Sequence, residues 1–101
     1  MTMSKMSPWQ IILAKHAPEL LKQATELQET AIRDGALSAK TKTLMMMLCD
    51  ALLAHPEGVA HFAEQARALG ASKNEIAETL AMAFLMGGLP GLVTGTNAFK
   101  D

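Results

Sequence analysis

Hydrophobic positions recur along this chain at helical spacing, and prolines and glycines interrupt them. The stretch Ser7–Gln10 has the pattern of a capping box with proline at the first helical position, and it predicts a short helix that ends near His16. Pro18 predicts the start of a second helix, and we expect Gly35 to end it. The apolar residues of this second helix share one face: Leu20, Ala24, Leu27 and Ala31.

The middle of the chain predicts a helix that is apolar on every side. Ser38 is a candidate N-cap for a helix from Ala39 to about Ala54, and the centre of that helix is the run Leu44–Cys49. A helix without a polar face is typical of a core or of an interface between subunits.

Three further helical segments follow. The tripeptide His55–Glu57 contains a proline that ends the apolar helix and starts a fourth one, which Gly70 ends. Ser72–Glu75 is a clear capping box, and its helix continues to Gly87-Gly88. A last, glycine-interrupted segment spans residues 90–99. The pattern therefore predicts an all-α fold, a compact bundle of about six helices in a single domain, residues 1–101.

Composition adds an expectation of self-association. Half of the 101 residues are hydrophobic but only 4% are aromatic, so Ala, Leu and Met dominate, and these residues favour helices. A chain of this size buries only about two-thirds of the surface that its unfolded form exposes. We expect the surplus apolar surface to be covered by further copies of the chain.

Charge and hydropathy exclude several classes of partner. The formal net charge is −1 and no basic stripe is present, so we expect no nucleic-acid binding. The longest apolar stretch, Leu80–Val93, has about 14 residues and falls short of the roughly 20 that a membrane span requires. Residues 1–7 lack an apolar signal core, and the single cysteine, Cys49, cannot form an internal disulfide. A cytoplasmic location is the resulting expectation.

Three segments resemble the carboxymuconolactone decarboxylase family, which belongs to the alkylhydroperoxidase D-like superfamily. They are Asp34–Lys42, Ala66–Glu78 and Met86–Gly91, and the likeness covers residues 34–99. The resemblance implies an all-α domain that forms oligomers, with an apolar pocket between helices. On this basis we expect a homotrimer or homohexamer that binds a small apolar or carboxylated ligand.

The family's redox site is absent from this sequence. In the peroxidase-like branch, the resemblance implies a Cys-x-x-Cys motif followed by a histidine, with a glutamate upstream. The corresponding positions here are His55, Gly58 and Phe62, with Thr43 in place of the glutamate. The chain therefore resembles a divergent member of the family, and we expect no thiol peroxidase activity and no cofactor.

The family's decarboxylase branch fits only in part. In that branch a helix that carries a histidine follows a Pro-Glu dipeptide, which Pro56-Glu57 matches. The expected histidine again falls on Phe62. His61 comes one residue earlier, and one residue corresponds to a rotation of about 100° on a helix.

Two histidines are the candidate catalytic residues. His55 can act as an acid or base that faces the pocket, or it can be a helix cap or a surface residue. His61 has Glu57 and Glu64 within a turn, and these carboxylates can either orient its imidazole or form ordinary solvated contacts. The spacing of the two histidines does not suit a metal site. His16 is more simply a partner for the C-terminal dipole of its helix.

Sulfur-containing residues suggest packing more than chemistry. Cys49 lies within the apolar helix, where we expect it to be buried and inert. The Met45–Met47 cluster, together with Met82 and Met86, can fill gaps between subunits or line a cavity.

Two functions remain open from sequence alone. One is acid/base chemistry of the lyase type on a small carboxylate or lactone. The other is a binding or assembly module that kept the scaffold and lost the site.

Overall fold

Helices make up the whole of the regular structure in residues 6–100, the part of the chain that this computed structural model describes. The predicted all-α fold is confirmed. The chain divides into two compact units, residues 1–33 and 34–101. The sequence predicts that the whole chain forms a single domain, and this stays a prediction.

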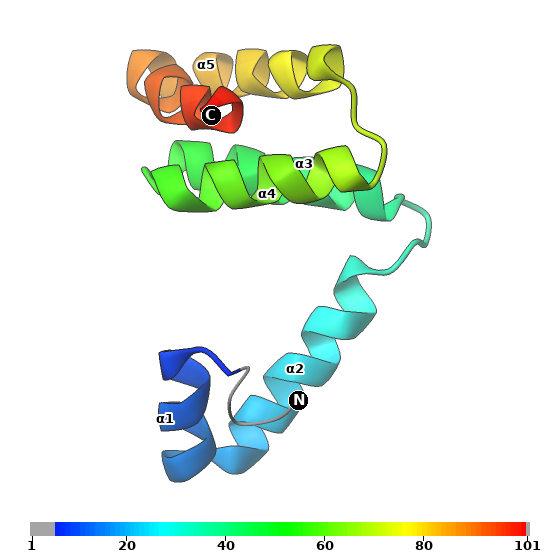
Figure 1. Ribbon diagram of the computed structural model, residues 1–101, viewed down its shortest axis with the longest axis vertical. Helices are drawn as coiled ribbons and strands as arrows, with labels where there is room; N and C mark the ends of the chain where they lie inside the picture. The colour runs from blue at the N-terminus through cyan, green and yellow to red at the C-terminus, as the bar shows by residue number, and fades with distance from the viewer. Residues whose placement is uncertain (1–5, 101) are drawn as a thin grey trace. The chain divides into compact units, whose positions relative to one another are not determined.

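The first unit is a pair of helices, α1 (Pro8–His16) and α2 (Pro18–Ile32), as Figure 1 shows. The cap predicted at Ser7 is present, because its backbone N–H donates to Gln10 Oε1 over 2.7 Å. Helix α2 ends at Ile32, before Gly35, so the predicted stop was wrong. The backbone becomes extended at Arg33 instead. The predicted apolar stripe of α2 is exposed within this unit: Leu20, Ala24, Leu27 and Ala31.

The second unit contains α3 (Ala39–Leu52), α4 (Pro56–Ala68), α5 (Lys73–Gly95) and the 3-10 helix η2 (Thr96–Phe99). Helix α3 packs against both α4 and α5. In Figure 1, α5 lies over the pair formed by α3 and α4, and the C-terminal segment folds back beside α5. Ser38 and Ser72 are the N-caps that the sequence predicts for α3 and α5.

The core of the second unit is small and built from all of its helices. Its largest fully buried side chains are Met47, Ile76, Val59 and Thr43. Helix α3 buries Thr43, Met47 and Ala51, which recur every four residues on one face. Cys49 lies two residues from Met47, about 200° around the helix, and is exposed. The expectation of a buried cysteine was therefore wrong.

Helix α5 consists of two arms joined at Gly88. This residue has φ 66° and ψ −161°, a conformation open to glycine but not to residues with a side chain. The second arm packs closely on the first, because a Cβ on Gly91 would lie 2.8 Å from the carbonyl oxygen of Ala83. Predicting separate segments before and after Gly87-Gly88 was therefore correct.

The stretch Lys73–Phe99 is long and apolar enough to cross a membrane by length and composition alone, and it contains an 18-residue window with a mean hydropathy of 1.6. The break at Gly88 divides it into two arms, and each is shorter than the roughly 20 residues of a spanning helix.

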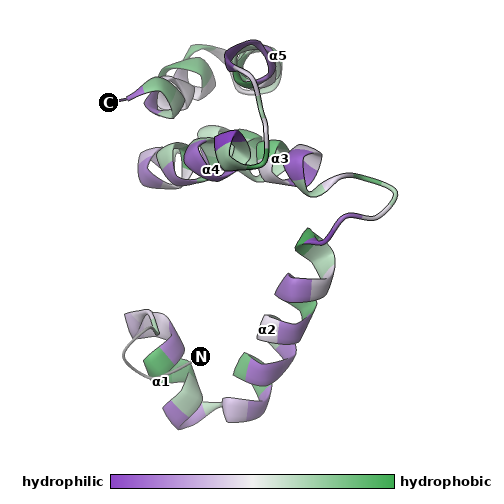
Figure 2. Cartoon of the chain, turned by 45° about the vertical axis from the view of Figure 1, so that its right-hand side comes forward, coloured by the Kyte–Doolittle hydropathy of each residue, from purple (hydrophilic) through white to green (hydrophobic). Residues whose placement is uncertain are grey.

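Large hydrophobic side chains are exposed on α1, α2, α3 and α5 of the described chain. The most exposed are Met86 (74%) and Leu85 (70%), both on α5. In Figure 2 the returning C-terminal segment is largely hydrophobic. An isolated copy of the chain thus leaves many large hydrophobic side chains exposed beside a small core.

Candidate functional site

The turn between α3 and α4 joins Asp50 to His55. Nδ1 of His55 lies 3.0 Å from Oδ1 of Asp50, and the backbone N–H of His55 donates to the Asp50 carbonyl over 2.9 Å. The Asp50 side chain is mostly buried, with 19% exposed, whereas that of His55 is 60% exposed. A mostly buried carboxylate in the last turn of α3 therefore contacts one nitrogen of an accessible imidazole.

This contact assigns different roles to the two ring nitrogens. An ionised carboxylate only accepts hydrogen bonds, so Nδ1 of His55 carries a hydrogen and donates it to Asp50. In the neutral ring, Nε2 then has a free lone pair. A histidine oriented through Nδ1 by a carboxylate is the arrangement required of a general base that acts through Nε2.

Gly58 completes the surroundings of this pair. It lies in the first turn of α4, and a Cβ at this position would overlap the Asp50 carboxylate, 2.7 Å from its Cγ. The carboxylate thus occupies the space that any side chain at position 58 would take.

His61 does not join this arrangement. It is exposed on α4, opposite the buried face that Val59 and Ala63 form. Its contact within residues 6–100 is an edge-on ring contact with Phe62, with centroids 5.1 Å apart. Neither Glu57 nor Glu64 hydrogen-bonds to it among the described residues, so the orienting role considered for these carboxylates is not seen.

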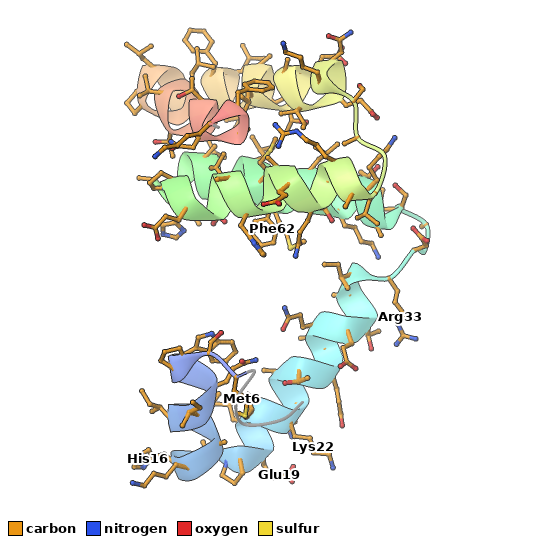
Figure 3. All side chains as sticks on the ribbon, in the orientation of Figure 1. Met6, His16, Glu19, Lys22, Arg33 and Phe62 are labelled. Carbon is orange, nitrogen blue, oxygen red and sulfur yellow. The ribbon has the colours of Figure 1, made fainter. Side chains whose placement is uncertain are left out.

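The other positions implied by the family pattern have structural roles. Thr43 is buried, and its hydroxyl donates to the backbone carbonyl of Ala39 over 2.8 Å. Phe62, labelled on α4 in Figure 3, is partly buried and packs against the core. Neither residue offers a titratable group where a proton relay would need one.

The sulfur-containing side chains divide between the core and the surface of the single chain. Met47 is in the core, whereas Met45, Met82 and Met86 are exposed together with Cys49. Across residues 6–100, no group of three His, Cys, Asp or Glu side chains is placed to hold a metal ion.

A groove of about 420 Å³ lies between α1 and α2 in the first unit. Its lining mixes Leu21 and Ala14 with the charged residues Lys22, Glu26 and Glu29. Neither His55 nor Asp50 lines this groove, and the apolar pocket between helices that the family resemblance implies stays a prediction. His16 lies at the end of α1 with its side chain directed outward (Figure 3).

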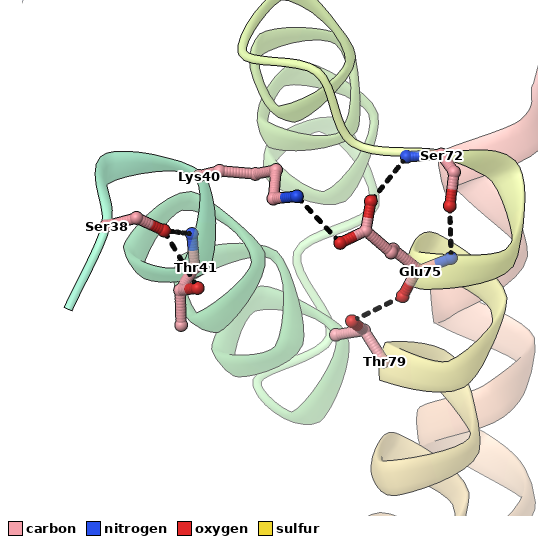
Figure 4. A network of polar contacts seen from close by, with 6 residues as sticks. All are labelled: Ser38, Lys40, Thr41, Ser72, Glu75 and Thr79. Atoms are coloured by element: carbon pink, nitrogen blue, oxygen red, sulfur yellow. Dashed lines mark hydrogen bonds and ion pairs between the residues drawn. The ribbon is translucent and has the colours of Figure 1, made fainter.

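A second polar cluster joins the N-terminal ends of α3 and α5 (Figure 4). Lys40 Nζ lies 2.8 Å from Glu75 Oε2, while the backbone N–H of Ser72 donates to Glu75 Oε1, also over 2.8 Å. The hydrogen bond from Lys40, followed by that from Ser72, lowers the pKa of Glu75. These groups cap α5 and connect two helices, which is a structural role.

Sequence reasoning singled out His55 as a candidate and placed Gly58 at a family position, but it did not predict that Asp50 contacts either residue. The available signal was an aspartate five residues before the histidine and a glycine three residues after it. Because a helix end intervenes, helical periodicity does not predict that these residues meet.

Comparisons with known proteins agree with this fold. The model of the carboxymuconolactone decarboxylase family matches residues 18–101. The structure resembles the crystal structure of a carboxymuconolactone decarboxylase family protein from Legionella pneumophila, with a TM-score of 0.78 and 33% sequence identity. This match covers 89% of the present chain and 80% of the other. A search of curated proteins finds no match.

Proposed function

This chain belongs to the carboxymuconolactone decarboxylase family, and on that premise we propose that it catalyses proton transfer on a small lactone or carboxylate. His55 serves as the acid/base and Asp50 as its positioning residue. The observation that supports this proposal is the 3.0 Å contact between His55 Nδ1 and Asp50 Oδ1.

The chemistry follows from the free lone pair on Nε2. A hydrogen on the carbon next to a lactone or carboxylate carbonyl is acidic because the resulting carbanion delocalises onto oxygen. Nε2 of His55 accepts this proton, and the buried carboxylate of Asp50 stabilises the imidazolium that forms. The same nitrogen then returns the proton to the product, so no redox partner is needed.

Self-association is the second part of the proposal. The His55 side chain is 60% exposed in the isolated chain, whereas proton abstraction from carbon benefits from a site that excludes water. A neighbouring copy that covers the exposed apolar surface of α3 and α5 would create an enclosed, apolar pocket.

A non-catalytic binding or assembly module is the alternative. It is favoured by Thr43 and Phe62, which fill two relay positions with side chains that pack and do not titrate. Thiol peroxidase activity has weaker support. Cys49 is exposed, but it is the single cysteine of the chain and has no second thiol to resolve an oxidised intermediate.

The test is to assay the wild-type chain against a panel of small lactones and carboxylates, by loss of substrate and by exchange of carbon-bound hydrogen with deuterated water. His55→Gln should lower the turnover number by about 10²-fold or more, while helix content stays unchanged. His61→Gln is the matched control and should retain activity.

Turnover that survives both substitutions would refute the site. Failure of the wild-type chain to turn over or exchange any member of the panel would support the binding module instead.

A further inference from the structure

The residue that permits the contact between Asp50 and His55 is Gly58. Its missing side chain leaves the space in which the Asp50 carboxylate lies. We infer that Gly58 is a positioning residue of this site, and that any side chain at position 58 disconnects Asp50 from His55.

The distances show which group would have to move. A Cβ on Gly58 would overlap Oδ2 of Asp50 and would lie 2.7 Å from its Cγ, but 3.3 Å from its Cβ. The first two separations are too short for atoms that are not bonded, while a shift of a few tenths of an ångström relieves the third. The backbone can therefore stay in place while the carboxylate rotates away, which breaks its 3.0 Å contact with His55 Nδ1.

This constraint couples two departures from the family's cysteine pattern. His55 and Gly58 stand where the resemblance expects the first and second cysteine. A histidine at position 55 paired with Asp50 requires a glycine at position 58, because a cysteine there also carries a Cβ. Gly58→Cys would not restore a redox pair, and it would remove the Asp–His pair. The catalytic relevance of the inference rests on the proposed function, but the geometric part does not.

The tautomer of His55 measures the contact directly. An imidazole without a partner in water favours a hydrogen on Nε2, whereas the Asp50 carboxylate holds it on Nδ1. Long-range ¹H–¹⁵N spectra of ¹⁵N-histidine-labelled protein, recorded where the rings are neutral, distinguish the two forms. The chain has three histidines, so His→Gln variants suffice to assign the signals.

We expect the Nδ1–H form of His55 in the wild type and a shift to Nε2–H in Gly58→Ala. Gly35→Ala is the matched control, because its Cβ would meet only Lys42 Nζ at an ordinary 3.7 Å. It should leave the His55 signal unchanged, and His61 should not respond to either substitution.

A double-mutant cycle with Asp50→Ala covers the case in which Gly58→Ala folds poorly. Without the carboxylate, Gly58→Ala should raise the melting temperature, because alanine favours a helix more than glycine does. With Asp50 present, the gain should be smaller or reversed.

The possible outcomes separate the two proposals. Two outcomes would overturn the positioning role of Gly58. One is an equal gain in melting temperature from Gly58→Ala with Asp50 and with Asp50→Ala. The other is a His55 Nδ1–H signal that persists in Gly58→Ala. A tautomer shift that leaves turnover unchanged would support the role of Gly58 and refute His55 as the reacting base.

Discussion

Ala54 has a positive φ of 61°. In the described part of the chain, the other residues with positive φ are two glycines. Ala54 lies between the end of α3 and His55, the N-cap residue of α4. The left-handed conformation reverses the backbone there, so that the N–H of His55 reaches the Asp50 carbonyl. For a residue with a side chain this conformation costs about 1–2 kcal/mol. The strain therefore lies directly beside the proposed site.

Ala54→Gly should relieve this strain and raise the free energy of unfolding by up to about 1 kcal/mol, because glycine adopts positive φ freely but loses more entropy on folding. Chemical denaturation of the two proteins measures the change. Ala77→Gly, on the exposed side of α5, is the control and should lower the stability by about 1 kcal/mol. Equal losses in both variants would show that Ala54 is not strained.

At the level of elements, α3 and α5 are joined at their N-terminal ends by Lys40 and Glu75. Glu75 also accepts from the backbone N–H of Ser72, while Ser72 Oγ accepts from the N–H of Glu75. One carboxylate thus caps α5 and pairs with a lysine of α3. The contact is near the surface, where both side chains are about one-third exposed, so solvent and salt weaken it.

The lowered pKa of Glu75 makes this contribution dependent on pH. Because the pKa is lower in the folded chain than its ordinary value of 4.5, the contribution is complete above that value and is lost as the pH falls through the folded pKa. Near pH 7, the melting temperature of the wild type should be higher than that of Glu75→Gln. This difference should disappear at acid pH. Glutamine keeps an oxygen for the cap, so the variant removes mainly the charge.

Lys40→Gln should lower the melting temperature by a similar amount. A variant that combines Lys40→Gln with Glu75→Gln should be no less stable than the less stable of the two single variants. A difference between wild type and Glu75→Gln that stays constant down to pH 2 would contradict a role for the charge.

On the scale of the whole molecule, one copy leaves many large hydrophobic side chains exposed. Helix α3 has one buried face, while Met45 and Leu52 remain exposed on it, as does its C-cap residue Leu53. Helix α5 adds Leu85 and Met86, which are exposed by 70% and 74%. Large apolar side chains exposed in such number on a small chain are typical of an interface.

We therefore predict a homo-oligomer, a trimer or a hexamer, in solution. Light scattering at low micromolar concentration should give a mass three or six times the 10.8 kDa of one chain. Leu85→Glu should shift the population toward smaller species, because a buried, unpaired carboxylate is costly in an apolar interface. Gln65→Glu, at an exposed polar position of α4, is the control and should not change the mass. A wild-type particle of 10.8 kDa alone would contradict the prediction.

Local sequence determined where most of the helices begin and what they are made of. Ser38, Ser72 and the prolines act within one turn of the backbone, so the starts of α3, α4 and α5 and the break at Gly87-Gly88 could be read from neighbouring residues. The end of α2 could not, since Gly35 lies beyond a backbone that had already become extended at Arg33.

The candidate site was decided by tertiary structure. His55 could be singled out as a titratable residue at a helix start, but its partner was set by the path of the turn through Ala54. The exposure of Cys49 depends on which face of an apolar helix meets α4 and α5, and a helix that is apolar all round does not specify that face. Caps and breaks act between neighbours in the chain, whereas the fit of Asp50 into the space at Gly58 exists only once α3 and α4 are packed together.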